Sequence, residues 1–347
     1  MPDDPAAVPE AACPDCGTVV APGFLACPTC RRLTHGAELK SLAAEAERAS
    51  NEGDLSAALA AWREALSLLP ADSRQHQTVQ KRLEELSRKV EAGPQPTRKK
   101  DAGGAKGAAG LGALGLLLWK LKTLLLLLAT KGKLLLLGLT KASTFLSMFL
   151  SFGVYWTAWG WKFALGLVVS IYVHEMGHVA TLRRYGIPAS APLFIPGFGA
   201  LVRLKQAPRT PREDARCGLA GPLWGLGAAL VAFAVFLATG AAIWGGIARC
   251  GAWINLFNLL PVWQLDGSRG FRSLSRGQRW VVALTFGALW FLTAEGLLVL
   301  IALAALFRAM ERDTVAEADR MGLLQFVFLA VALSALCAWL GPIGGGP

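Results

Sequence analysis

The chain has 347 residues, of which 54% are hydrophobic, and it carries a formal net charge of +11. The apolar residues are concentrated in residues 111–341, in runs long enough to cross a bilayer as helices, whereas residues 1–110 are polar and charged. This segregation excludes a wholly soluble protein and predicts one soluble region followed by one membrane region. The first residues lack the pattern of a signal peptide, so we expect the N-terminal region to stay in the cytoplasm.

Two C-x-x-C knuckles lie within residues 10–35. Their members are Cys13, Cys16, Cys27 and Cys30. A segment this short cannot build a hydrophobic core, and four thiolates at this spacing can enclose one tetrahedral zinc ion. We therefore predict a zinc ribbon that holds one structural Zn²⁺ with all its ligand positions filled. Two disulfides are the alternative, which the reducing cytoplasm disfavours.

Residues 36–92 are predicted to be helical. The apolar periodicity indicates two amphipathic helices within residues 39–70, separated at Gly53 and Asp54, and a third helix over residues 72–92. The spacing of small and aromatic residues is similar to that of a single tetratricopeptide repeat. One repeat alone must bury its apolar face against a neighbour or a partner. A binding site for a protein partner and a hairpin that acts only as a spacer both remain open.

Residues 93–110 and 111–142 connect this region to the membrane domain. The first segment is rich in Gly and Pro and contains three adjacent basic residues, which predicts a flexible linker attracted to anionic lipid. No aromatic platform or base-reading motif accompanies the basic residues, so we expect no nucleic-acid binding. The second segment is Leu-rich, but each of its lysines would cost about 2.5–3.5 kcal/mol at the centre of a bilayer. We therefore predict interfacial helices there.

Residues 143–341 make up the predicted transmembrane domain. After a first span at about residues 143–157, an apolar helix over about 161–185 carries the pattern H-E-x-x-H at His174, Glu175 and His178. Histidines four residues apart share one face of a helix and can bind one zinc ion, while Glu175 lies where it can take a proton from water. The alternative, a pair of buried histidines without a metal, leaves unpaired polar groups in an apolar span, which is costly.

A Pro- and Gly-rich loop, residues 186–205, follows this helix. It contains an extended apolar pattern that includes Leu201, Val202 and Arg203. We predict a hairpin or re-entrant strand beside the metal site, whose edge pairs with an extended substrate. The many arginines in and after this loop mark its side of the membrane as cytoplasmic.

A second motif, N-x-x-P-x-x-x-x-D-G, ends the apolar run at residues 244–262. It comprises Asn258, Pro261, Asp266 and Gly267. A catalytic zinc ion needs a third protein ligand. The span at residues 218–240 crosses outward and the next returns, so Asp266 reaches the side where the histidines lie and can supply that ligand.

Together the two motifs resemble those of the site-2 protease family of intramembrane zinc metalloproteases, over about residues 143–339. The resemblance includes the pair Gly221–Pro222, at which we expect the helix between the two motifs to begin. It implies a catalytic Zn²⁺ held by His174, His178 and Asp266. It further implies that Glu175 is the general base and acid, and that Asn258 steadies the substrate strand or the oxyanion. The PDZ domain of some family members is missing from this sequence.

The C-terminal part of the chain contains one more ionisable residue in an apolar run. Residues 280–307 predict either one tilted helix or a broken one, with Glu295 near the middle, and residues 321–340 predict a final span. We expect Glu295 to be protonated or hydrogen-bonded rather than a metal ligand.

The sequence therefore predicts a mostly α-helical, polytopic membrane protein in the bacterial inner membrane, with a cytoplasmic N-terminus. The implied activity is hydrolysis of a peptide bond in or next to a transmembrane segment of a membrane-anchored protein. The N-terminal module would recruit that substrate or gate its access. The alternative is a catalytically silent scaffold that binds protein partners, although a bracing zinc ion would not need Glu175. A metal transporter would need more polar spans than this sequence has.

Overall fold

The computed structural model describes residues 11–93, 142–197, 199–202, 206–311, 315 and 317–341. Apart from their end residues 93 and 142, the predicted linker (93–110) and interfacial helices (111–142) lie outside the described residues, as does Arg203. The chain forms two compact units. One consists of Met1–Pro96 with Arg183–Pro188, and the other consists of Thr97–Leu182 with Ala189–Pro347. Each unit is described by itself.

The first unit begins with the cysteine-rich segment. Strand β1 (Ala11–Ala12) pairs antiparallel with β2 (Val19–Val20). Cys13 and Cys27 are buried together with Val20 in a small cluster. Few apolar residues contribute to this cluster, which is consistent with a segment that depends on metal ligands for its stability.

Three helices follow: α1 (Gly36–Asn51), α2 (Leu55–Ser67) and α3 (Arg74–Ala92). The predicted break between the first two is confirmed, because Gly53 adopts a left-handed φ of +82° and the Asp54 carboxylate accepts a hydrogen bond from the Ala57 amide. Ala46 on α1 and Ala58 on α2 are fully buried. Their small side chains let the two helices pack closely, which is the reason for small residues at these positions.

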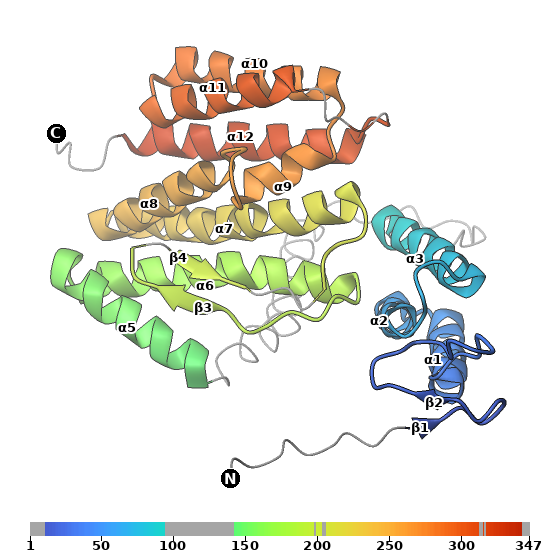
Figure 1. Cartoon of the computed structure of the whole chain (residues 1–347). Helices are drawn as coiled ribbons and strands as arrows, with labels where there is room; N and C mark the ends of the chain where they lie inside the picture. The colour runs from blue at the N-terminus through green and yellow to red at the C-terminus, as the bar shows by residue number, and fades with distance from the viewer. Residues whose placement is uncertain are drawn as a thin grey trace, which may run out of the picture. The chain divides into compact units, whose positions relative to one another are not determined.

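The second unit contains the remaining helices and a hairpin. They are α5 (Ala142–Trp159), α6 (Trp161–Arg184), β3 (Leu193–Ile195), β4 (Gly199–Leu201), α7 (Pro211–Thr239), α8 (Ala242–Asn258), α9 (Asp266–Arg272), α10 (Arg276–Thr293), α11 (Gly296–Met310) and α12 (Arg320–Leu340). Helix α7 packs against α8 and α9, α12 packs against α8, and α10 pairs with α11 (Figure 1). The loop forms the antiparallel β3–β4 hairpin that its sequence predicts, and this hairpin packs against α5.

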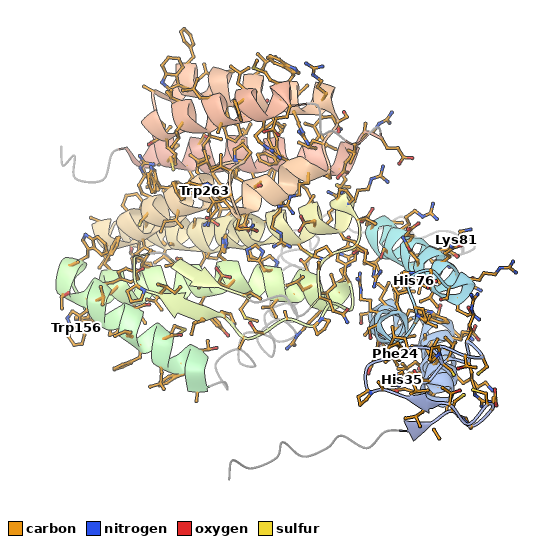
Figure 2. All side chains as sticks on the ribbon, in the orientation of Figure 1. Phe24, His35, His76, Lys81, Trp156 and Trp263 are labelled. Carbon is orange, nitrogen blue, oxygen red and sulfur yellow. The ribbon has the colours of Figure 1, made fainter. Side chains whose placement is uncertain are left out.

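Three described helices, α6, α7 and α12, are long and apolar enough to cross a membrane. Helix α5 has large exposed apolar side chains, among them Phe145, Phe149 and Trp156, and Figure 2 shows Trp156 on the outer side of this helix. A helical surface of this kind suits contact with lipid. The mostly α-helical membrane fold is therefore as the sequence predicts.

The helix between the two motifs begins earlier than predicted. The Thr210 hydroxyl accepts a hydrogen bond from the Glu213 amide at 3.1 Å, and Pro211 occupies the first turn, so α7 starts ten residues before Gly221. Gly221 and Pro222 consequently lie inside α7 and do not open it. The expectation that the helix begins at Gly221–Pro222 was wrong, because the residues that cap the helix, Thr210 and Pro211, lie earlier in the chain.

The predicted run at residues 280–307 is two helices joined by a tight turn. Ala294 has a left-handed φ of +53° and ends α10, and α11 starts at Gly296. Glu295 in this turn accepts a hydrogen bond from Arg249 Nη2 of α8 at 2.5 Å, and Arg249 Nε donates to the Gly341 carbonyl at 2.6 Å. Glu295 is therefore hydrogen-bonded, as expected, and its partner ties α8 to the turn and to the end of α12.

Candidate metal centre

Three donor side chains converge inside the second unit. The Nε2 atoms of His174 and His178 lie 3.2 Å apart, and they lie 3.1 and 3.3 Å from the two carboxylate oxygens of Asp266. All three side chains are buried. A tetrahedral zinc site with bonds of about 2.0–2.1 Å has edges of roughly 3.3 Å. These three residues therefore have the donor types and spacing that zinc requires.

The two histidines lie against the backbone of α7. A Cβ atom added at Gly221 would lie 2.2 Å from His178 Nε2 and 2.7 Å from His174 Nε2. On α6 itself, a Cβ atom at Gly177 would lie 2.5 Å from the Ala220 carbonyl oxygen. Glycine on both helices lets α6 and α7 approach closely, so the backbone of α7 forms one wall of the site.

Hydrogen bonds orient both imidazole rings. His178 Nδ1 lies 2.7 Å from the Cys217 carbonyl oxygen, and because a carbonyl only accepts, Nδ1 carries the proton. His174 Nδ1 lies 2.8 Å from Asn255 Oδ1, while Asn255 Nδ2 donates to the Gly251 carbonyl at 2.7 Å, so the amide presents its oxygen to the ring. In the neutral imidazoles, this tautomer leaves both Nε2 atoms free to bind a metal.

Asp266 is placed by the start of α9. The adjacent Gly267 packs against Leu259, the residue that follows α8, where an added Cβ atom would lie 1.9 Å from the carbonyl oxygen, so no larger residue fits. Asp214 on α7 accepts hydrogen bonds from Arg269 Nε at 2.8 Å and from Arg272 Nη1 at 2.9 Å. These two bonds fasten α9 to the helix that forms the wall of the site.

The other predicted site residues lie as follows. Glu175 is buried on α6 next to His174, and it is not among the donors that cluster within 4.8 Å of one another. Asn258 is the partly buried last residue of α8. Leu201 ends β4 and Val202 follows it, whereas Arg203 lies outside the described residues. The structure thus brings together the two histidines and Asp266, with Glu175 adjacent in sequence.

The four cysteines of the first unit also converge. Cys13 Sγ lies 3.6 Å from Cys30 Sγ, and Cys16 Sγ lies 3.5 Å from Cys27 Sγ. A disulfide needs about 2.05 Å between its sulfur atoms, whereas zinc bonds of about 2.3 Å give edges of roughly 3.8 Å. The hydroxyl and the backbone of Thr18 lower the pKa of the Cys16 thiol, whereas its hydrogen-bonded cysteine neighbours raise the pKa of the Cys30 thiol, so the sulfur spacing rather than the pKa values indicates a metal site. The cluster fits a structural zinc site.

Similarity to known proteins agrees with this chemistry. Residues 162–243 match the model of Peptidase family M50. The zinc metalloprotease MJ0392 of Methanocaldococcus jannaschii is 28% identical over 121 residues, which are 33% of this chain and 34% of the relative. Rip3 of Mycobacterium tuberculosis, whose name assigns it provisionally to the zinc metalloproteases, is 34% identical over 131 residues, which are 35% of this chain and 32% of Rip3. No solved structure matches the chain.

These matches support the site-2 protease family and the zinc metalloprotease class for the second unit. The family match runs from the start of α6 to the start of α8, so it contains His174, Glu175 and His178 but not Asp266. The chain spans about a third of the length of the curated relatives it matches. The family match therefore says nothing of Asp266, whereas the structure places it beside the histidines.

Asn255 is a site residue that the sequence analysis missed. It lies on α8 one turn before Asn258, and its side chain is 2% exposed. Gly225 of α7 makes room for it, because an added Cβ atom there would lie 2.0 Å from Asn255 Oδ1. A polar amide within a mostly apolar helix was the available signal, since such groups are rare in spans without a partner.

We expect Asn255→Ala to weaken zinc binding at His174 by about 10- to 100-fold, the usual effect of removing a residue that orients a metal ligand. Asn255→Asp keeps the oxygen that accepts from His174 and should retain the metal. Competition with a chromophoric chelator measures both affinities. Equal affinities for wild type and Asn255→Ala would show that the ring does not need this hydrogen bond.

Proposed function

We propose that the protein is an intramembrane zinc metalloprotease that cleaves a membrane-anchored protein in or next to its transmembrane segment. The observation that carries the proposal is the convergence of His174, His178 and Asp266, with the buried Glu175 directly after His174 on α6. Helix α6, which carries both histidines, and helix α7, which forms one wall of the site, are apolar enough to span a membrane. Cleavage of a single-span substrate by the purified protein tests the proposal.

The mechanism assigns one task to each residue. Zinc held by His174, His178 and Asp266 would polarise the scissile carbonyl and acidify the attacking water. Glu175 takes a proton from that water and delivers it to the leaving amine. Asn258, at the end of α8, steadies the substrate strand or the developing oxyanion. The burial of the site keeps bulk water from these groups.

The β3–β4 hairpin is proposed to hold the substrate in an extended form. The Phe194 amide donates to Ser147 Oγ of α5 at 3.0 Å, so the outer edge of β3 is occupied by α5. Phe194 pairs with Ala200, and amides alternate along a strand, so the amides of Ala200 and Val202 point to the outer edge of β4. That edge, at Leu201 and Val202, is the one proposed to pair with a substrate strand, and Arg203, also predicted to bind the substrate, lies outside the described residues.

Val202→Pro should lower the cleavage rate several-fold with zinc retained, because proline removes an amide that would donate to the substrate strand. Val202→Ala keeps the amide and serves as the control. Initial rates on a single-span substrate measure the effect. Unchanged cleavage by Val202→Pro would exclude pairing at this edge.

We further propose one catalytic and one structural zinc ion, a location in the bacterial inner membrane and a cytoplasmic N-terminus. The substrate would be a membrane-anchored regulator released by the cut, and no nucleic-acid partner is expected. A catalytically silent scaffold is the rival from another class. Glu175 favours the enzyme, because it is buried directly after His174 without being one of the converging donors.

A further inference from the structure

The helical region of the first unit holds a segment that is distant in sequence. Residues Arg183–Pro188 belong to the same compact unit as α1, α2 and α3. This segment contains the last two residues of α6 and the four residues after it. We call α1–α3 the helical module and Arg183–Pro188 the held segment.

Two hydrogen bonds and two buried side chains join them. The guanidinium of Arg63 on α2, 1% exposed, donates from Nε to the Tyr185 carbonyl at 3.0 Å. Arg184 donates from Nη2 to the Val90 carbonyl of α3 at 2.5 Å. Tyr185 and Ile187 are almost completely buried. The held segment therefore supplies apolar cover of the kind that a lone helical repeat requires.

The backbone of the held segment touches α2 directly. Gly186 has a left-handed φ of +63°, and an added Cβ atom would lie 2.5 Å from the Ala60 amide nitrogen and 2.8 Å from the Ser56 carbonyl oxygen. Both neighbours are backbone atoms inside a helix and cannot move aside easily. Only glycine fits, so this contact is specific to the segment.

We propose that the helical module is an intramolecular binding module whose ligand is the held segment, and that its grip fixes the end of the helix that carries His174 and His178. Helix α6 is continuous from Trp161 to Arg184, and His178 lies less than two turns before its end. In the gripped structure the three metal donors converge. The state in which the helical module binds the held segment is therefore the state that binds metal. Release of the held segment weakens metal binding.

This role differs from an open peptide site or a passive spacer. The proposal rests on the proposed function only for the cleavage readout. Zinc affinity and hydrogen exchange test it independently, so failure of the grip and absence of protease activity are distinguishable.

The test compares Gly186→Ala with Gly160→Ala in the full-length protein. Gly160 lies just before the other end of α6 and has a left-handed φ of +80°, but nothing lies within 4 Å of its added Cβ atom. The control variant thus carries the same kind of backbone strain without the contact. Gly186→Ala should weaken zinc binding at the His174 site by roughly 2- to 30-fold, and it should speed amide exchange in the held segment and the end of α6.

Gly160→Ala should leave zinc affinity and exchange near the wild-type values, and both variants should keep the ribbon zinc. If Gly186→Ala does not fold, Arg184→Ala removes one hydrogen bond to the helical module and leaves the buried contacts in place. Arg183→Ala, a change at the neighbouring exposed residue, is its control. Only Arg184→Ala should weaken the metal and speed exchange. Wild-type zinc affinity and exchange in Gly186→Ala, or in Arg184→Ala, would overturn the proposal.

Discussion

Glu175→Gln should lose cleavage while zinc remains bound at His174, His178 and Asp266. The amide has the size of the carboxylate but cannot take a proton from water or return one to the leaving amine. General acid–base catalysis typically contributes about 10²- to 10⁴-fold, so the rate should fall by that factor. The measurement is the initial rate on a purified single-span substrate in detergent, together with the zinc content of each preparation.

The matched control is Glu317→Gln, the same chemical change at an exposed residue that pairs with Arg212. It should cleave at the wild-type rate. A Glu175→Gln protein that cleaves normally would remove Glu175 from the mechanism. A Glu175→Gln protein that has lost its catalytic zinc would show that Glu175 is a ligand rather than the base.

Asp266→Ala should lower the zinc content from about two to about one per chain and abolish cleavage, because a catalytic zinc ion needs three protein ligands. The two histidines alone would hold the metal weakly, and the cysteine ribbon should keep its own ion. Elemental analysis after gel filtration measures the content.

The complementary variant is Cys30→Ser, which breaks the ribbon instead. It should lose the structural ion and retain the one at His174. If Asp266→Ala still bound about two zinc ions, the third ligand would have to be another residue. If Cys30→Ser lost both ions, the two sites would not be independent.

Much of the candidate centre could be predicted from local sequence. Four-residue spacing on one helix places His174 and His178 together, and the order of the predicted spans brings Asp266 to the same side of the membrane. These patterns lie within short stretches of the chain, so they can be recognised without knowing which distant segments pack together. The same is true of the helical region, where Gly53 and the capping residue Asp54 mark the break between two helices.

The remaining features depend on packing between distant segments. The hydrogen bond of Asn255 to His174 joins residues 81 positions apart, and the bond of Arg63 to Tyr185 joins residues 122 positions apart. Gly221 matters because α7 lies against the imidazoles, which its position in the sequence does not reveal. Arg249 and Glu295 read as isolated charges in apolar runs until the fold pairs them.

The most direct test of the central claim is cleavage by the purified wild-type protein of a membrane-anchored, single-span substrate, with the cut located by mass spectrometry. We expect one or a few cuts in or next to the transmembrane segment, loss of activity when a chelator removes the metal, and its return on addition of Zn²⁺. Cleavage that survives complete removal of the metal, or cuts confined to soluble loops far from the span, would contradict the assignment.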